Sequence, residues 1–152
     1  MGDKTLVSNR RARREYFIEE TYEAGLVLKG SEIKSIRAGR ANLQDSYVTI
    51  RDGEAWLVNT HVSPYKQASI ENHEPKRDRK LLLNRREIDR LVGKVQAKGY
   101  TMIPLRLYLK NNRAKVEIAL AKGKKLYDKR ANLAKRQAQR DMERAMRRSR
   151  HD

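Results

Sequence analysis

The 152-residue sequence contains no cysteine, which excludes a disulfide framework and the cysteine spacings of zinc fingers. It also lacks any apolar run long enough for a secretory signal or a membrane-spanning helix, so we expect a cytoplasmic protein. Glycine and proline are both missing beyond residue 130, where most residues are strong helix formers or arginine. The chain therefore divides into a body with turns and a C-terminal tail without them.

Acidic residues are scarce as well. The chain has 19 Asp and Glu against 36 Lys and Arg, which gives a net charge of +17. A charge this large on a small protein implies a polyanionic partner. An anionic membrane is the competing polyanion, but no segment places a wide apolar face beside a basic one. The favoured partner is therefore a nucleic acid, with no role for a membrane.

The sequence contains no recognisable catalytic constellation. Its three histidines lack the spacing of metal ligands, and there is neither a phosphate-binding loop nor a nucleophile motif. Glu19 and Glu20 are neighbours on a predicted strand, so their carboxylates point to opposite faces. We therefore assign no catalytic residue, no metal and no cofactor, and expect a protein that is not an enzyme. A nuclease site assembled from distant carboxylates stays open as an alternative.

The length fits a single domain with an appendage. We predict a flexible N-terminus over residues 1–8, a compact RNA-binding body over residues 9–122 and a basic tail over residues 123–152.

Alternating apolar residues predict two hairpins in the body. The first spans residues 42–59 and turns at residues 52–53, an Asp-Gly pair that favours the twisted two-residue turn. The second spans residues 101–121 and turns at residues 111–112. Its outward side chains are basic with one aromatic, Tyr108.

Further elements surround these hairpins. A first strand begins at residue 16, and we expect it to break or bulge at residues 23–25. A short helix follows from residue 31, with Glu32 on its outward side. The clearest helix begins at Asn84, where Glu87 three residues later resembles a capping box. Together these elements predict a mainly β fold, a small antiparallel OB-fold-like barrel with flanking helices that leaves few exposed edges.

Basic residues of the body mark a candidate RNA surface. The arginines of the segment RRARR, residues 10–14, cluster just ahead of the first strand. We interpret them as a phosphate-contacting edge, with Arg11 and Arg13 as its principal members, rather than a solvated arm. Lys34 and Arg37 on the predicted short helix are assigned to the same surface.

The tail carries twelve basic and four acidic residues between Lys122 and Asp152. Its apolar residues form a thin helical stripe of mostly small side chains, so burying the stripe would stabilise a helix little. We expect the tail to be disordered when free and to become helical on RNA, from about Asn132 onward. A disordered, solubilising extension is the alternative.

Six segments in chain order resemble the SsrA-binding protein (SmpB) family. They are NRRARREYFI at residues 9–18, EAGL at 23–26, GSEIKSIRAG at 30–39, DSY at 45–47, KLLLN at 80–84 and AKGKKLYDKR at 121–130. The resemblance implies an OB-fold barrel that binds the tRNA-like domain of transfer-messenger RNA. It also implies a tail that occupies the decoding centre and mRNA channel of a stalled ribosome, as a monomer and without catalysis.

The resemblance assigns residues as well. It implies contacts with the tRNA-like domain at Asn9, Glu23, Leu83 and Lys115. It implies a ribosome-contacting set in the tail, which comprises Lys122, Lys124, Lys125, Tyr127, Asp128, Lys129, Arg130 and Met146. Family members often have histidine where this chain has Tyr127, and some have isoleucine in place of Ala145. A general OB-type RNA-binding or ribosome-associated protein stays the alternative function, and an RNA-processing enzyme is a more distant one.

Overall fold

The computed structural model describes residues 3–65, 72–96 and 100–151, except for the side chains of residues 125–134 and 148–151. Nine strands and four helices lie in this part of the chain. In chain order they are β1 (Lys4–Ser8), α1 (Arg10–Glu15), β2 (Tyr16–Leu26), α2 (Gly30–Arg37), β3 (Ala41–Asn42), β4 (Tyr47–Arg51), β5 (Glu54–Val58), β6 (His61–Val62), β7 (Arg79–Leu82), α3 (Arg85–Val95), β8 (Tyr100–Lys110), β9 (Arg113–Gly123) and α4 (Lys124–His151).

The main sheet is antiparallel and has seven strands in the order β1-β8-β9-β2-β7-β5-β4, while β3 and β6 pair separately. The sheet curls until β4 packs beside β8, but these two strands are not hydrogen-bonded neighbours. The predicted mainly β, OB-like fold is confirmed. The expected removal of strand edges is not met, because β1 and β4 remain the two ends of an open sheet.

Both predicted hairpins are present. The first turn has positive φ at Asp52 (51°) and Gly53 (75°), and the second has it at Asn111 (51°) and Asn112 (62°). Two consecutive residues with positive φ match the right-handed twist of the flanking strands, which is why Asp, Asn and Gly occupy these four positions. The strands β4 with β5 and β8 with β9 therefore pair in the register that the alternation predicts.

Two corrections concern the N-terminal third. Residues 1–8 were expected to be flexible, yet Lys4–Ser8 pair with β8, because Leu6 and Val7 pack against the main core. The strand β2 does not break at residues 23–25. It runs unbroken to Leu26, and its register shift lies earlier, between Ile18 and Glu20.

The predicted cap at the start of α3 is confirmed. Asn84 and Glu87 form the predicted capping box, with hydrogen bonds of 2.9 and 3.2 Å.

Glu32 was expected on the outward side of α2, but it is fully buried. Its carboxylate accepts hydrogen bonds from the backbone N–H of Lys29 (2.8 Å) and from Arg79 (2.5 Å), and it also pairs with Arg77. This network fastens α2 to the start of β7.

The two faces of the sheet are packed differently. The inner face holds the main core, to which β9 contributes Val116, Ile118 and Leu120. On the outer face, Ala119 and Ala121 lie under Ala12 of α1 in a second, smaller cluster. Lys115 and Glu117, earlier on the same face of β9, lie beyond that cluster. The outer face near the β8–β9 turn is thus free to carry polar side chains.

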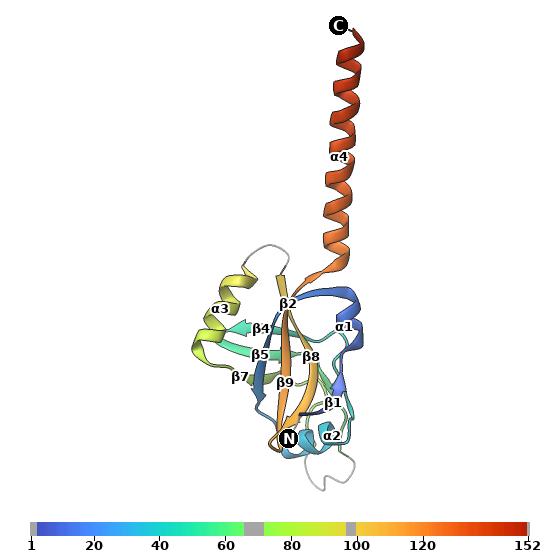
Figure 1. Ribbon diagram of the computed structural model, residues 1–152. Coiled ribbons are helices and arrows are strands. Elements are labelled where there is room, and N and C mark those ends of the chain that lie inside the picture. The colour runs from blue at the N-terminus through green and yellow to red at the C-terminus, as the bar shows by residue number, and fades with distance from the viewer. Residues whose placement is uncertain (1–2, 66–71, 97–99, 152) are drawn as a thin grey trace.

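The helix α4 continues directly from β9 and projects away from the body, at the end opposite to α2 and the β8–β9 turn (Figure 1). It begins at Lys124, earlier than the predicted Asn132. Every described side chain between Lys135 and Arg147 is exposed. The body therefore contains both hydrophobic clusters without any contribution from these residues.

Candidate nucleic-acid interface

Glu23 is the acidic centre of a polar group on the outer face. Its carboxylate accepts a hydrogen bond of 2.6 Å from the Tyr108 hydroxyl and one of 3.3 Å from the Lys110 ammonium. The guanidinium of Arg106 lies 4.0 Å from the centre of the Tyr108 ring. We call Glu23, Arg106, Tyr108, Lys110 and Lys115 the Glu23 cluster.

The Glu23 cluster corrects the prediction that Tyr108 is an exposed aromatic. Only 2% of Tyr108 is accessible, because Arg106 covers its ring and Glu23 binds its hydroxyl. The hydrogen bond from Tyr108 is the main reason that the pKa of Glu23 lies below its usual value, with Lys110 adding to the effect. Burial and the same hydrogen bond raise the pKa of Tyr108. Glu23 is thus a carboxylate that positions a phenol and an ammonium, with 38% of its own side chain still exposed.

Lys115 lies beside Glu23 because β9 pairs with both β2 and β8. It is opposite Gly25 on one side and Tyr108 on the other. A side chain at Gly25 would come within 3.3 Å of Leu82 and 3.6 Å of the Lys115 ammonium, so glycine leaves room for both to approach the strand.

The three leucines at residues 81–83 differ in burial, and only Leu81 is fully buried. Leu82 is 54% exposed, and Leu83 is half-buried against the main core. The alternation of a strand explains the difference, since Arg79 and Leu81 point inward and Leu82 points outward. Leu82 is therefore the more accessible leucine beside the Glu23 cluster.

Asn9 is part of the framework of the body. Its side chain accepts from Ala12 N–H (3.2 Å) as the N-cap of α1 and donates to the carbonyls of Pro104 (2.9 Å) and Leu43 (3.4 Å). The residue is 8% exposed. These bonds orient α1 and its arginines against the sheet.

The arginines of α1 fall into two groups. Arg11 pairs with Glu15 at 2.7 Å, and Arg13 pairs with Glu117 at 3.6 Å. Arg10 and Arg14 are exposed and make no ion pair within the described part of the chain. Glu117 also binds Arg106 at 3.4 Å, so it links α1 to the Glu23 cluster. The basic outer surface therefore continues from α1 across β9 and β8.

The helix α2, which carries Lys34 and Arg37, lies at the end of the body that holds the β8–β9 turn (Figure 1). Arg37 donates to the carbonyl of Asn112 in that turn at 3.1 Å, while the Lys34 ammonium lies 5.3 Å from the ring centre of Tyr65. Both side chains are exposed. The structure thus brings Arg37 close to the hairpin that carries Lys110 and Lys115.

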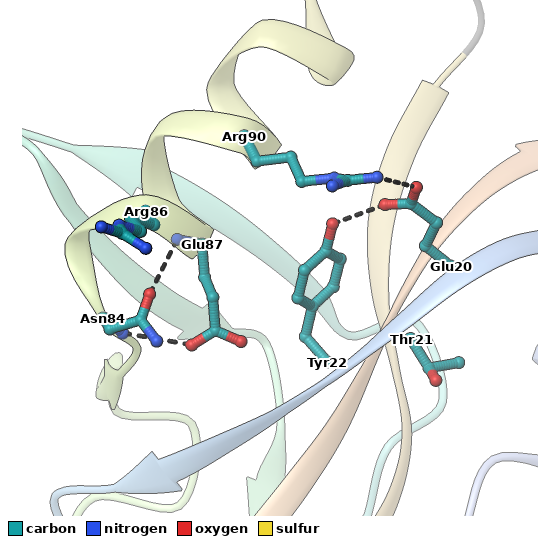
Figure 2. Close-up of a pocket in the computed structure, with 7 residues that line it drawn as sticks. All are labelled: Glu20, Thr21, Tyr22, Asn84, Arg86, Glu87 and Arg90. Carbon is teal, nitrogen blue, oxygen red and sulfur yellow. Dashed lines mark hydrogen bonds and ion pairs between the residues drawn. The ribbon is translucent and has the colours of Figure 1, made fainter.

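A pocket of about 550 Å³ lies between β2 and α3 (Figure 2). In it, Glu20 accepts from Arg90 (2.7 Å) and from the Tyr22 hydroxyl (2.5 Å), while Glu87 is engaged in the cap of α3. Burial and the bond to Glu20 raise the pKa of Tyr22 to about 12. These interactions tie α3 to β2. Across the described residues, no group of three or more His, Asp or Glu side chains is placed to hold a metal ion.

The SmpB protein family model matches residues 6–148. This chain belongs to the SmpB family. It is 64% identical over 145 residues to an SsrA-binding protein of Desulforudis audaxviator, with 95% of each chain covered. It is 60% identical over 151 residues to an SsrA-binding protein of Roseiflexus castenholzii, with 98% of this chain and 96% of the relative covered.

A solved structure is also similar. It is described as "tmRNA-SmpB: a journey to the center of the bacterial ribosome", and it matches with a TM-score of 0.66 and 49% identity, over 77% of this chain and 82% of that one. The SmpB family resemblance drawn from the six sequence segments is therefore confirmed.

Only part of the SmpB-like tail can be placed. Lys122 is the penultimate residue of β9, Lys124 is the first residue of α4, and Met146 is 57% exposed. The side chains of five predicted contacts lie outside the described residues: Lys125, Tyr127, Asp128, Lys129 and Arg130. Their backbone belongs to α4. No described helix is long and apolar enough to cross a membrane.

Sequence reasoning missed the partners of Glu23. Arg106, Tyr108 and Lys110 alternate with apolar residues along β8, which signals an outward face but not its contacts. Their approach to Glu23 depends on the order β8-β9-β2, in which β9 lies between them. No local sequence signal reports that order.

Proposed function

We propose that this SmpB-family protein binds the tRNA-like domain of transfer-messenger RNA and delivers it to stalled ribosomes for trans-translation. The observation that carries the proposal is the match to the SmpB family over residues 6–148, together with similarity to a solved SmpB structure described with tmRNA and the ribosome. In this proposal the protein acts as a monomeric binding partner in the bacterial cytoplasm and catalyses no reaction.

The outer face supports a role in recognising the tRNA-like domain. It combines exposed cations on α1 and α2 with the Glu23 cluster, and this combination suits phosphates beside ribose or base donors. Lys115 belongs to the cluster, Leu83 packs against the main core beneath the sheet, and Asn9 acts through the placement of α1. Glu23 accepts hydrogen bonds from the RNA and holds Lys110 in place for a phosphate.

The tail supports a second contact. The helix α4 is basic and projects from the far end of the body, so a ribosomal channel can surround it while the outer face holds the other RNA (Figure 1). Asp128, Lys129 and Arg130 would fix its position at the decoding centre, with Tyr127 stacked on a base. Without the ribosome we expect this segment to lose much of its helix, because its exposed residues receive no packing energy.

A titration of the full-length protein with the isolated tRNA-like domain tests the first contact. The control is an elongator tRNA of matched length, and each titration is repeated at several salt concentrations. We expect tighter binding to the tRNA-like domain, with log K falling by about 0.7 to 0.9 for each phosphate neutralised. Equal affinity for both RNAs would instead identify a general RNA-binding protein, and salt-independent binding would contradict phosphate contacts.

A further inference from the structure

The N-terminal strand β1 contains a bulge that turns one of its polar side chains toward the outer face. The register places Thr5 opposite Tyr108 and Val7 opposite Leu107, which leaves Leu6 as an extra residue between the two pairs. Without that extra residue the earlier part of β1 would shift by one position, and Thr5 would point inward. Bulges re-aim side chains in this way. The bulge therefore directs the Thr5 hydroxyl to the face that carries the Glu23 cluster.

Arg106 is the residue through which β1 contacts the Glu23 cluster. Its Nη1 donates a hydrogen bond of 2.9 Å to the Thr5 hydroxyl, and its Nη2 lies 3.6 Å from the Asp3 carboxylate. Its Nε donates to Glu117 at 3.4 Å. Partners at all three nitrogens fix the orientation of the planar guanidinium, which lies over the Tyr108 ring, 4.0 Å from its centre.

Tyr108 connects the orientation of Arg106 to that of Glu23. Because Arg106 covers the ring, only 2% of Tyr108 is accessible, and its hydroxyl donates to the Glu23 carboxylate at 2.6 Å. The Lys110 ammonium lies 3.4 and 3.3 Å from the two oxygens of the same carboxylate. A carboxylate that is held before binding loses little rotational freedom when it contacts a ligand.

We propose that Thr5 and Asp3 are positioning residues for RNA recognition, which orient Arg106 on the Tyr108 ring and thereby hold the Glu23 carboxylate ready for hydrogen-bond donors of the RNA. The proposal rests on the proposed function, in which Glu23 contacts the tRNA-like domain. Neither Thr5 nor Asp3 has to touch the RNA. In this way β1, at one end of the sheet, contributes to recognition by a cluster that extends to β2.

The test compares full-length variants in titrations with the isolated tRNA-like domain. Thr5→Val keeps the β-branched shape but removes the hydroxyl, so affinity should fall about threefold, the cost of immobilising one more side chain on binding. Asp3→Asn should weaken binding less, because the Asp3 carboxylate lies farther from Arg106 than the Thr5 hydroxyl does. Thr49→Val, on β4 at the other end of the sheet, is the matched control and should bind as wild type.

A double-mutant cycle shows whether the effect passes through Tyr108. Tyr108→Phe keeps the ring beneath Arg106 but cannot donate to Glu23, so adding Thr5→Val to it should cause no further loss of affinity. If Thr5 only stabilises β1, Thr5→Val will lower affinity by the same factor in both backgrounds, and the proposal is wrong. Wild-type binding by both Thr5→Val and Asp3→Asn would also overturn it. Melting temperatures identify any variant that has lost its fold, and Asp3→Asn keeps the test decisive if Thr5→Val unfolds.

A measurement on the protein without RNA separates this proposal from the proposed function. The hydrogen bond from Tyr108 lowers the pKa of Glu23, and an NMR titration of the carboxyl carbon measures that pKa. In Thr5→Val the pKa of Glu23 should rise toward its usual value, because the phenol is held less firmly, while in Thr49→Val it should not change. An unchanged pKa in Thr5→Val would contradict the positioning role. Equal affinity of the wild-type protein for the tRNA-like domain and an elongator tRNA would refute the proposed function instead.

Discussion

The body and α4 are stabilised by different means. Inside the body, strands from Lys4 to Gly123 bury the main core and a second cluster under α1. In α4, every described side chain from Lys135 to Arg147 is exposed, including Met142 (59%) and Met146 (57%). A core fixes the body whatever it binds, whereas a helix with no buried face depends on a partner to keep it ordered. We therefore expect the body to be the recognition unit and α4 to respond to its surroundings.

Removing α4 is the strongest way to test this difference. A protein that ends at Lys125 should keep its melting temperature and its affinity for the tRNA-like domain, because neither hydrophobic cluster draws on the deleted residues. It should fail to support peptide tagging in a reconstituted translation reaction with stalled ribosomes. Full tagging by this protein would mean that the tail is only a solubilising extension.

A substitution inside the body tests the stability of the body alone. Glu32→Gln leaves Arg79, which is 1% exposed, without a countercharge, and should reduce the free energy of unfolding by about 3–5 kcal/mol. Glu54→Gln breaks an exposed pair with Lys80 and is the control, with an expected loss of at most about 1 kcal/mol. Urea unfolding curves measure both. Similar losses in the two variants would show that the buried network does not hold α2 to β7.

A third change separates recognition from stability. Glu23→Ala should lower affinity for the tRNA-like domain about tenfold, a loss of the size expected for a hydrogen bond to a charged group, while circular dichroism shows an unchanged fold. Glu19→Ala removes the same charge from an exposed position on β2 and should bind as wild type. Equal or tighter binding by Glu23→Ala would mean that the outer face does not carry the recognition.

A smaller effect is expected at Tyr127. Tyr127→Ala should reduce tagging several-fold, and Tyr127→His should reduce it less, because an imidazole ring can still stack on a base. Binding of the tRNA-like domain should be unaffected in both variants. If the alanine and histidine variants tag equally well, stacking at this position does not contribute.

Acid should weaken the body gradually. Hydrogen bonds from Tyr108 and Lys110 keep the pKa of Glu23 below its usual 4.5. Burial opposes ionisation of Glu32, but the bonds from Arg77, Lys29 and Arg79 outweigh it, so the pKa of Glu32 is lowered too. A lowered pKa contributes stability above the unfolded-state value that is lost as pH falls through the folded-state value. The free energy of unfolding should therefore decline below about pH 4.5, and less steeply in Glu23→Gln.

The features that the sequence predicts correctly are those that depend on a few neighbouring residues. The two-residue turns and the cap at Asn84 each depend on a few neighbouring residues with a strong conformational preference, and both lie where the sequence predicts them. Predictions of side-chain exposure that rest on how polar residues usually behave were wrong at two positions. Glu32 and Tyr108 are polar residues on amphipathic elements, yet both are buried, because distant arginines or a distant glutamate bind them.

The sequence by itself determined the two hairpins with their turns, the cap of α3, the basic charge and the SmpB family, since composition and local pattern carry all of these. Only the tertiary structure decided which side chains meet. Glu23 reaches Tyr108 and Lys110 across β9, Arg79 reaches Glu32 of α2, and Arg106 reaches Thr5 of β1. The physical reason is that strand order and register bring together residues far apart in the chain, and neither quantity is specified by the residues next to them.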